Sequence, residues 1–364
     1  MYGPRVSGIG NYVKNLIDSL LKIDSENEYI IFMLKDGFDE FKPIQKNVKK
    51  VMVDCKWYTL REQRKYWRIC EKEKIDVMHF PNFNVPLLYT RKFVVTIHDM
   101  TPWHFPGNKV ASSSVRWLAY ATVFNSAIKR AEKVITVSEF SKEEIIKKYT
   151  RARKKIEVVY NGVSASFQRI DNYGIINLAK EKYGIKKPYI FFIGVWRDHK
   201  NIPGLIQAFT ILCEKYKMDM QLVLGGDKTK SSKEIELEIQ KSSVGDNIIA
   251  TGFIPDADLP AIYSGAELTV IPSFIEGFGM HAIESLQCKT PVVGSKTTSL
   301  PEILGDCAVY FDPYEPSNMA EVIYNVLLDD LLKKSLIEKG QKIIQKYSWD
   351  ECAKKTLQIY KNIH

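Results

Sequence analysis

The sequence predicts an α/β protein built from two doubly wound domains. Short runs of β-branched and aromatic residues alternate with stretches of helical periodicity along most of the chain. This alternation is typical of parallel sheets that carry helices on both faces. A chain of 364 residues is long enough for two domains, each with its own core, and the predicted strands are too many for one simple sheet.

The strands fall into two groups, separated by a stretch without strand character. In the first half they are predicted at 29–33, 48–53, 77–80, 93–97, 133–137 and 156–160, and in the second half at 189–193, 221–224, 247–250, 268–271, 291–294 and 309–311. Residues 164–188 lack strand character, so we divide the chain into domains 1–165 and 166–347, followed by a last helix within 348–364.

The beginning of the chain is unusual for a doubly wound domain. Such a domain usually opens with a strand that leads into its first glycine loop, but here the chain starts almost at that loop, residues 3–10. We expect that a leading strand is missing from this sequence. The alternative is that the sheet lacks this strand.

Composition narrows the possible functions. No apolar run approaches the roughly 20 residues that cross a bilayer, no cleavable signal peptide is visible, and the six cysteines are scattered. These features favour a cytoplasmic protein with reduced thiols.

The net charge of +9 is concentrated in two basic stretches, 56–74 and 142–155. They are either solvated helix faces or contacts with anionic partners. No nucleic-acid recognition motif accompanies them, so we expect no nucleic-acid partner.

The strongest motif is IPSFIEGFGMHAIE at 271–284. A predicted strand ends in a loop that holds Glu276 and two glycines, and a helix begins near Gly279 or Met280. Free amides at a helix start suit an anion such as a diphosphate, and the carboxylates of Glu276 and Glu284 can accept hydrogen bonds from sugar hydroxyls. The alternative is a loop carboxylate and a solvated helix residue without a ligand.

Two further motifs follow predicted strands. FIGVWRDHKN at 192–201 places Arg197 and Lys200 at the carboxyl edge of a sheet, where cations suit a diphosphate; the alternative is an exposed basic loop. VTIHDMTPWHFP at 95–106 places His98 and Asp99 at the corresponding edge of the first domain. A metal site with His104 is weakly supported, because no third ligand lies nearby in the sequence.

Two further sequence patterns resemble known motifs but do not support the binding sites that those motifs form. SGIGNY at 7–12 resembles a dinucleotide fingerprint but has Val13 in place of the third glycine, so NAD binding is not expected, and we interpret it as a flexible glycine loop. Asp256 and Asp258 resemble a DxD metal motif, but they stand just before a helix and are more simply an N-cap or first-turn residues. We therefore expect no metal and no cofactor.

Taken together, these runs resemble the retaining glycosyltransferases of the GT-B fold, family four by its usual numbering. The matching pieces are GIGNY, VTIHD, VITVSEFSKEEI, VVYNGV, FIGVWRDHKN, LVLGGD, the run from ATGFIPDADL to EGFG, and the tail from MHAIESLQ to YFDP. They occur in the family's order across nearly the whole chain. The resemblance implies two Rossmann-like domains facing across a cleft, with the nucleotide-sugar donor on the second domain and the acceptor on the first. It also implies that the last helix crosses back to the first domain.

The resemblance also implies roles for individual residues. Glu284 would hold the ribose, Glu276 and the amides of 277–280 the donor sugar, and Arg197 and Lys200 the diphosphate. His98 would lie beside the anomeric carbon. Many relatives carry Arg at the position of His199, so Arg197 is taken as the first cationic partner. The implied donor-binding residues are Gly8, Gly10, Arg197, Lys200, Gly252, Phe253, Ile254, Glu276, Gly277, Phe278, Gly279, Met280 and Glu284, with His98, Glu276, Arg197 and Lys200 as the catalytic set.

The predicted reaction is transfer of a hexose with retention, by attack of the acceptor on the front face of the donor sugar and without metal. No carboxylate is well placed to be a nucleophile, since Asp99 is the only nearby candidate. The VTIHDMTPWHFP and GVWRDHKN runs look most like those of bacterial surface-polysaccharide mannosyltransferases, which makes GDP-mannose the first donor. A sugar-nucleotide epimerase or hydrolase and a nonenzymatic sugar-nucleotide-binding protein are the alternatives.

The acceptor is expected to be a saccharide or a lipid-linked saccharide. Trp57, Tyr58, Tyr66 and Trp67 interleave with Arg61, Arg64, Lys65 and Arg68 on a predicted helix. Such a face could contact an anionic membrane peripherally, at the inner side of the cell membrane. The alternative is an ordinary amphipathic helix packed on its domain.

Overall fold

A computed structural model describes residues 8–55, 59–106, 113–227 and 232–363. The chain divides into two compact units, the first formed by Met1–Gly162 and Ser348–His364 and the second by Val163–Tyr347. The first unit is therefore discontinuous in sequence, since the last helix belongs to it. Among the described residues, no helix is both long and apolar enough to cross a membrane.

The first unit carries the early elements of the chain and its last helix. Its strands are β1 (Tyr29–Met33), β2 (Val48–Met52), β3 (Met78–Phe80), β4 (Phe93–Ile97), β5 (Lys133–Thr136) and β6 (Ile156–Val158). Its helices are α1 (Gly8–Ile23), α2 (Lys35–Glu40), α3 (Leu60–Lys72), α4 (Thr101–His104), α6 (Ser114–Arg130), α7 (Glu139–Lys148) and α16 (Trp349–Lys361), with a 3-10 turn at Thr150–Lys155.

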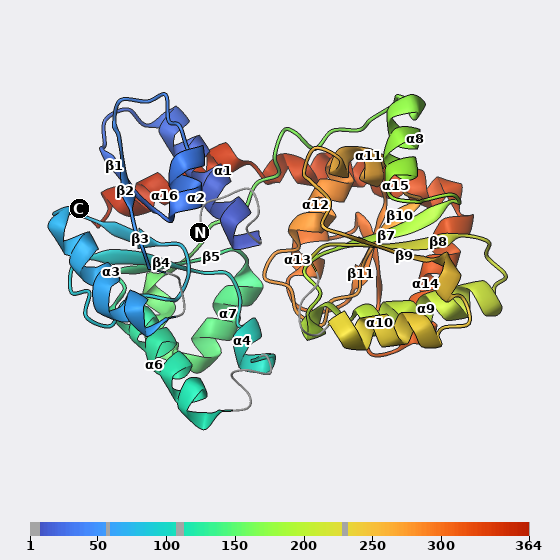
Figure 1. Cartoon of the computed structure of the whole chain (residues 1–364), viewed down its shortest axis with the longest axis horizontal. Coiled ribbons are helices and arrows are strands. Elements are labelled where there is room, and N and C mark those ends of the chain that lie inside the picture. Colours follow the sequence, from blue (N-terminus) through green and yellow to red (C-terminus); the bar gives the residue numbers. More distant parts are fainter. Residues whose placement is uncertain (1–7, 56–58, 107–112, 228–231, 364) are drawn as a thin grey trace. The chain divides into compact units, whose positions relative to one another are not determined.

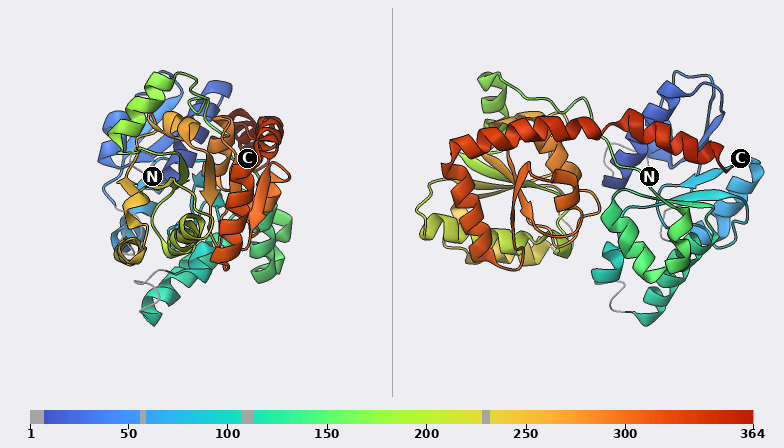
Figure 2. Two further views of the ribbon diagram at one scale, coloured as in Figure 1. Left: turned by 90° about the vertical axis from the view of Figure 1, so that its right-hand side faces the viewer. Right: turned by 180° about the vertical axis from the view of Figure 1, so that it is seen from behind.

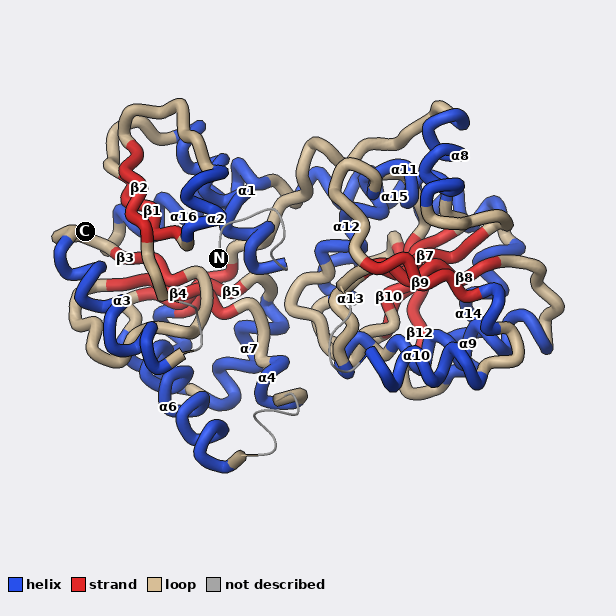
Figure 3. Tube along the Cα trace, in the orientation of Figure 1, coloured by secondary structure: helices blue, strands red, loops and turns tan. Residues whose placement is uncertain are grey.

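The strands of the first unit form two separate parallel sheets. One has the order β1-β2 and the other β3-β4-β5-β6, and Figure 3 shows them as distinct groups of strands. We predicted one doubly wound sheet for this domain, but β1 and β3 do not pair in the described structure, which differs from that prediction. Helix α16 packs along α1, as the views in Figure 2 show.

The glycine motif near the start of the chain forms a helix and not the flexible loop that we predicted. Gly8 and Gly10 both lie in the first turn of α1, and Gly10 is buried. The apolar residues that follow explain this, because Val13, Leu16 and Leu20 recur at helical spacing and are all buried.

The second unit alternates strands and helices throughout. Its strands are β7 (Tyr189–Ile193), β8 (Gln221–Gly225), β9 (Ile248–Gly252), β10 (Leu268–Ile271), β11 (Val292–Ser295) and β12 (Ala308–Phe311). Its helices are α8 (Tyr173–Lys182), α9 (Ile202–Glu214), α10 (Ser232–Lys241), α11 (Leu259–Gly265), α12 (Met280–Gln287), α13 (Leu300–Leu304), α14 (Pro316–Leu328) and α15 (Asp330–Ile343), with 3-10 turns at Asp198–Lys200, Gly245–Asn247 and Ile344–Lys346.

These strands form one parallel sheet with the order β12-β11-β10-β7-β8-β9. After β7 the chain adds β8 and β9 on one side of that strand, and it then adds β10, β11 and β12 on the other side. The strand order therefore reverses between β7 and β10. Ligands of open α/β sheets bind outside the carboxyl ends of the strands at such a reversal. The predicted α/β class with parallel sheets is confirmed, and every predicted strand is present, with ends that shift by a few residues.

Alternating side chains of the second sheet form its two cores. Ile190 and Phe192 of β7 pack with α9 and α14, whereas Tyr189 and Phe191 pack with α11 and its neighbours. All residues of β7 are buried, as expected for a strand covered by helices on both sides. Figure 1 shows α9 and α10 on one side of this sheet and α8 and α11 on the other.

Helix starts follow local capping chemistry. Thr59 accepts a hydrogen bond from the Glu62 N–H, and Ser348 accepts from the amides of Asp350 and Glu351. These side chains satisfy amides that the helix itself leaves unpaired. The caps fix where α3 and α16 begin.

Candidate active site

Three loops meet at the point where the strand order of the second unit reverses. β11, β10 and β7 are neighbours in the sheet, and all run in parallel, so their carboxyl ends share one edge. The loop after β7 carries Lys200, the loop after β10 carries Glu276, and the loop after β11 carries Thr298 and Ser299. The two strongest sequence motifs therefore converge on one place.

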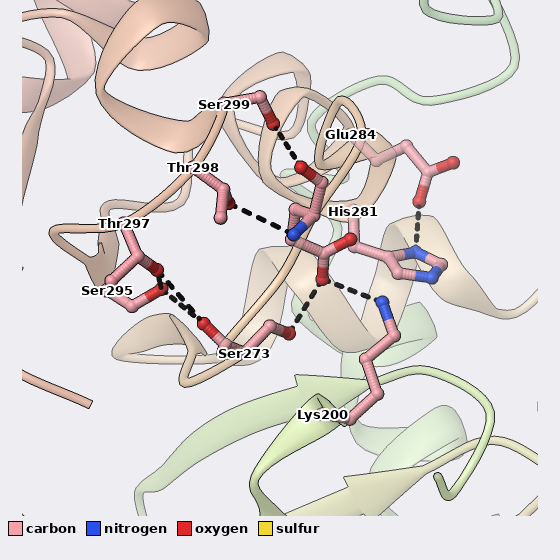
Figure 4. Close-up of polar contacts among 9 residues, drawn as sticks. Lys200, Ser273, His281, Glu284, Ser295, Thr297, Thr298 and Ser299 are labelled. Carbon is pink, nitrogen blue, oxygen red and sulfur yellow. Dashed lines mark hydrogen bonds and ion pairs between the residues drawn. The ribbon is translucent and has the colours of Figure 1, made fainter. Parts of the chain in front are cut away.

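Lys200 and Glu276 form an ion pair within this site. Lys200 Nζ lies 2.7 Å from Glu276 Oε1, and the two side chains are only 15% and 14% exposed. Ser273 Oγ donates to the same carboxylate oxygen at 2.7 Å, as Figure 4 shows for Lys200 and Ser273. Burial alone would raise the pKa of Glu276, but the Lys200 ammonium and these hydrogen bonds outweigh it and hold the pKa below its usual value. Glu276 is therefore ionised at neutral pH.

The backbone of Glu276 is fixed from the neighbouring loop. Its N–H donates to Thr298 Oγ1 at 3.1 Å, and Ser299 Oγ donates to its carbonyl at 2.9 Å. Ser295 Oγ donates to the carbonyl of Ser273 at 2.6 Å. Figure 4 shows this group of hydroxyls surrounding the loop. The Glu276 carboxylate is thus held on a rigid frame.

The loop after β7 is tied to the loop after β10 through Asn201. This residue has a left-handed backbone with φ of 51°, and its Nδ2 donates to the carbonyls of Pro272 at 3.2 Å and Pro313 at 2.8 Å. The Phe274 N–H donates to the His199 carbonyl at 2.8 Å. These bonds keep Lys200 beside Glu276.

Arg197 lies in the same loop but differs from Lys200. Its side chain is exposed, and among the described residues it makes no ion pair, whereas Lys200 is largely buried against a carboxylate. The two cations were predicted to share one role. The structure distinguishes a preorganised cation from an exposed one.

Helix α12 starts directly after this loop, as the glycine pattern predicts. Gly279 precedes the helix with φ of 86°, and no side chain caps the first turn. The positive φ favours glycine here, and a Cβ at this position would lie 2.7 Å from Leu300 Cδ2, so the Leu300 side chain would have to shift. The uncapped amides at the start of α12 can bind an anion. Phe278 is buried against Tyr347, with ring centroids 5.3 Å apart.

Glu284 lies one turn into α12 and is buried, with 3% of its surface exposed. The interpretation of Glu284 as a solvated helix residue is therefore wrong. Its Oε2 accepts from the Tyr263 hydroxyl at 3.1 Å and lies 3.0 Å from His281 Nδ1. Among the described residues Oε1 has no partner. Figure 4 shows His281 turned toward Glu284.

The edge of the sheet at β9 carries three of the implied donor-binding residues, Gly252, Phe253 and Ile254. Gly252 ends β9 with φ of 70°, Phe253 is 48% exposed, and Ile254 is buried in the core. Phe253 thus offers an aromatic surface, while Ile254 can contribute only backbone groups.

His98 belongs to the first unit and follows β4. Its Nε2 lies 3.0 Å from the Pro81 carbonyl, and its ring packs edge-on against Tyr12 with centroids 4.7 Å apart. A carbonyl can only accept, so Nε2 carries the proton and Nδ1 is the acceptor. Burial is the main cause that lowers the pKa of His98, so the ring is neutral at pH 7.

Asp99 and His104, the other candidates near His98, make local contacts within the first unit. Asp99 Oδ1 accepts from the Thr101 N–H at 2.8 Å, so its carboxylate stabilises the turn into α4. His104 lies 3.1 Å from Glu144 on the surface. Within the described ranges, no group of three His, Cys, Asp or Glu side chains is arranged to hold a metal ion.

Asp258 is the N-cap residue of α11, as predicted, although its side chain makes no capping hydrogen bond. Its carboxylate instead accepts from Lys182 Nζ at 2.6 Å and from the Tyr183 hydroxyl at 2.5 Å. The predicted N-cap position is therefore confirmed, while the carboxylate binds a lysine at the end of α8 and the phenol of the residue that follows it.

The aromatic and basic residues of α3 separate onto two faces. Tyr66 and Trp67 pack against the core of the first unit, while Arg64, Lys65 and Arg68 are exposed. Trp57 and Tyr58 lie outside the described residues. For Tyr66 and Trp67 this matches the expectation of an amphipathic helix packed on its domain.

Several residues that build the site were not singled out from the sequence. They are Asn201, Tyr263, Ser273, His281, Thr298 and Ser299. His281 could have been found, because it stands three residues before Glu284 in a predicted helix, where side chains meet. Tyr263 and Thr298 are distant in sequence and could be found only from the fold.

Comparison with protein families gives two matches that together span most of the chain. A family described as "Glycosyltransferase Family 4" matches residues 6–167, and one described as "Glycosyl transferases group 1" matches residues 176–343. The O-antigen chain mannosyltransferase B of Escherichia coli is 28% identical over 306 residues, which cover 83% of this chain and 78% of that protein.

Solved structures share the fold at lower identity. The sucrose-phosphate synthase of Thermosynechococcus elongatus has a TM-score of 0.78 at 19% identity and covers 99% of this chain and 96% of its own. HepE of Anabaena, solved with UDP and glucose, has a TM-score of 0.76 at 17% identity and covers 99% of this chain and 98% of its own. These likenesses confirm the predicted fold.

Proposed function

Because the chain belongs to the glycosyltransferases described by these two families, we propose that it transfers a hexose, in the first place mannose, from GDP-mannose to an acceptor. The acceptor is a saccharide or a lipid-linked saccharide in surface-polysaccharide synthesis. The observation that carries this proposal is the Lys200–Glu276 pair beside the uncapped start of α12. The similarity to a mannosyltransferase of O-antigen synthesis supports mannose as the sugar.

The cations of the site would bind the diphosphate of the donor, and its carboxylates would bind the hydroxyl groups. The diphosphate carries negative charge and would lie against Lys200, Arg197 and the first amides of α12. Glu276, kept ionised by Lys200, would accept hydrogen bonds from hydroxyls of the sugar. Oε1 of Glu284, which has no partner in the described part of the chain, would accept from a ribose hydroxyl, since Tyr263 and His281 contact Oε2.

The transfer step would proceed on one face of the sugar. The bond between the anomeric carbon and the diphosphate oxygen breaks, and the acceptor oxygen forms its new bond on the same face. The acceptor proton passes to the leaving diphosphate, whose charge Lys200 and Arg197 stabilise. The neutral ring of His98 would orient the sugar through the acceptor nitrogen Nδ1, a role that needs no positive charge. No metal takes part in this scheme.

The test uses labelled donors and product analysis. We expect transfer from GDP-mannose to extracted lipid-linked saccharides, with the configuration at the anomeric carbon retained in the product by NMR. UDP-glucose and UDP-galactose serve as competing donors. Rearranged or hydrolysed sugar without a transfer product would favour an epimerase or hydrolase, and donor binding without any turnover would favour a nonenzymatic binding protein.

A substitution of Glu276 tests whether the transfer activity depends on this site. Glu276→Gln keeps the shape of the side chain but removes its charge, so we expect transfer to fall at least about 100-fold, the scale of a lost preorganised contact. Glu321→Gln, on an exposed position of α14, is the matched control. Transfer by Glu276→Gln at the control's rate would contradict the role of Glu276.

The place of action is part of the same proposal. We propose that the protein works in the cytoplasm and that the exposed cations of α3 contact anionic lipid at the inner face of the cell membrane. Since Tyr66 and Trp67 pack inward, this contact would rest on charge and weaken with salt. Flotation with vesicles containing phosphatidylserine tests it, and no binding at low salt would contradict it.

A further inference from the structure

Two aromatic side chains stack on each other at the carboxyl edge of the second sheet. Phe274 belongs to the loop after β10 and Tyr314 to the loop after β12. Their ring centroids lie 4.8 Å apart, with an angle of 22° between the ring planes. Phe274 stands two residues before Glu276. One of the two rings therefore belongs to the same loop as the carboxylate of the candidate site.

Tyr314 exposes most of its side chain, although Phe274 covers one face of its ring. The side chain is 68% exposed, so the face that points away from Phe274 is open to solvent. A single exposed aromatic ring is common on protein surfaces. Whether this ring has a role is therefore decided by how it is held and by what lies next to it.

The two loops that carry the rings are tied together by one buried side chain. Asn201 is 6% exposed, and its Nδ2 donates to the carbonyls of Pro272 and Pro313. These prolines stand two residues before the first ring and directly before the second. Asn201 also directly follows Lys200, so the same residue connects the stacked pair to the cation of the site.

The backbone around each ring is fixed as well. The Tyr314 N–H donates to Asp312 Oδ1 at 2.9 Å, and the Asp312 N–H donates to Asn318 Oδ1 at 2.9 Å. The Phe274 N–H donates to the His199 carbonyl at 2.8 Å. The Tyr314 ring is thus held in place before a ligand arrives, which reduces the conformational entropy that binding would cost.

An open aromatic face suits the apolar face of a sugar ring. The face of an aromatic ring carries partial negative charge, and the axial C–H bonds of a pyranose present weakly positive hydrogens on one side of the sugar. The hydroxyl groups at the rim of the sugar stay available for water or for polar side chains. A pyranose is therefore a ligand that this ring can hold.

A nucleobase also stacks on aromatic rings, but the implied donor-binding residues place it elsewhere. β12 and β9 are the two edge strands of the described sheet. Tyr314 follows β12, whereas the stretch 252–254, with the exposed ring of Phe253, lies at the end of β9. The Tyr314 ring therefore stands at the opposite edge of the sheet from that stretch.

The donor sugar is likewise assigned to another part of the loop. Ser273 donates to the Glu276 carboxylate, while the ring of the next residue, Phe274, stacks on Tyr314. The stacked pair therefore lies beside the Lys200–Glu276 ion pair and not on it. A sugar on Tyr314 would be a neighbour of the donor sugar, which is the place of an acceptor residue.

We propose that Tyr314, backed by Phe274, is a stacking subsite for a pyranose ring of the acceptor saccharide. This inference rests on the proposed function, because it names the part of the acceptor that the second unit holds. The contact recognises the apolar face of the ring and not a pattern of hydroxyl groups. It therefore adds affinity for saccharide acceptors as a class, and specificity for one sugar comes from other groups.

The kinetics of transfer test this subsite. Tyr314→Ala removes the ring but keeps the N–H that bonds to Asp312. We expect the acceptor KM to rise about tenfold, the scale of one lost aromatic contact, while the donor KM stays unchanged. Tyr314→Phe keeps the ring and should restore most of the affinity. Tyr173→Ala, at a side chain that is 77% exposed on α8 of the same unit, is the matched control.

Binding without turnover separates this inference from the proposed function. Saturation-transfer NMR of the full chain with methyl α-mannoside and with methyl α-glucoside should show saturation of the hydrogens on one face of the sugar. The signal should be lost in Tyr314→Ala and kept in Tyr173→Ala. This result would support the subsite even if no donor gave a transfer product.

Two outcomes would overturn the proposal. If the NMR signals or the acceptor KM values of Tyr314→Ala and Tyr173→Ala were equal, the ring would hold no sugar. If Tyr314→Ala raised the donor KM and left the acceptor KM unchanged, the ring would belong to the donor site and the assignment to the acceptor would be wrong.

Discussion

Lys200 and Glu276, 76 residues apart in sequence, meet at 2.7 Å where the strand order of the second unit reverses. Each follows a different strand, and each would be a poor residue to bury alone. Their pairing means that the site holds one cation and one anion in fixed positions before any ligand arrives. A ligand that carries both a phosphate and hydroxyls suits such a pair.

Replacing Lys200 should remove most of the catalytic activity. In Lys200→Met the diphosphate loses a fixed charge, and Glu276 loses the partner that keeps its pKa low. We expect kcat/KM for donor turnover to fall at least about 100-fold. Lys182→Met, which breaks a more exposed pair with Asp258 in the same unit, is the control. Values for the two variants within threefold of each other would rule out the role of Lys200.

Removing the Tyr263 hydroxyl should weaken donor binding. Tyr263→Phe takes a hydrogen bond from the buried Glu284 carboxylate, and such a bond to a charged group contributes about 1.5–3 kcal/mol. We expect the donor KM to rise about tenfold with a smaller change in kcat. Tyr189→Phe also loses a buried hydroxyl bond, to the Ile262 carbonyl, so it should be destabilised with an unchanged KM. Equal donor KM values in the two variants would show that Glu284 does not hold the donor.

Substitution of Gly279 should destabilise the second unit by about 2–3 kcal/mol, through backbone strain and the contact with Leu300. Gly184→Ala separates the two causes, because Gly184 also has a positive φ of 71° but nothing within 4 Å of an added Cβ. Urea denaturation of both variants measures the difference. If Gly279→Ala were no less stable than Gly184→Ala, the contact with Leu300 would have no energetic weight.

The first unit should lose stability in mild acid. Burial lowers the pKa of His79 to about 3, while the unfolded chain titrates near 6.5. Below that value the unfolded state takes up a proton and the folded state does not, so the free energy of unfolding falls by up to about 1.4 kcal/mol per pH unit until the pH approaches 3.

The variant His79→Gln tests this dependence through denaturation between pH 7 and 4. Its slope should be shallower than that of the wild type, although not zero, because His98 contributes with the same sign. Identical slopes for the wild type and His79→Gln would contradict the assignment.

Chelation should leave transfer unchanged. The proposed charges come from Lys200, Arg197 and the amides of α12, and the Asp258 carboxylate is already occupied by Lys182 and Tyr183. We expect equal rates with EDTA and with added Mn²⁺. Loss of activity in EDTA that Mn²⁺ restores would contradict metal independence.

The sequence was most informative where the hydrophobic pattern is continuous. Strands such as 189–193 and 268–271 are buried on both faces and were located to the residue, and the loops that follow them were correctly expected at one edge. The helical start at Gly8 was missed because paired glycines favour a loop in isolation, whereas packing of Leu16 and Leu20 decides the outcome.

The residues that contact the two candidate carboxylates could not be predicted from the sequence. Glu276 and Glu284 were identified as candidates, but their contacts with Thr298 and Tyr263 depend on how distant elements fold together. The separation of β1 from β3 likewise depends on tertiary packing, since each strand taken alone has the expected pattern.

The membership of α16 in the first unit affects the order in which the protein can fold during synthesis. The second unit is continuous and can fold as soon as residue 347 has left the ribosome, but the first must wait for α16. Tyr360 then completes the contact with His79, and Trp349 that with Tyr12. The earliest-translated half is therefore the last to mature, and a stop codon near residue 348 would leave it unfinished beside a folded second half.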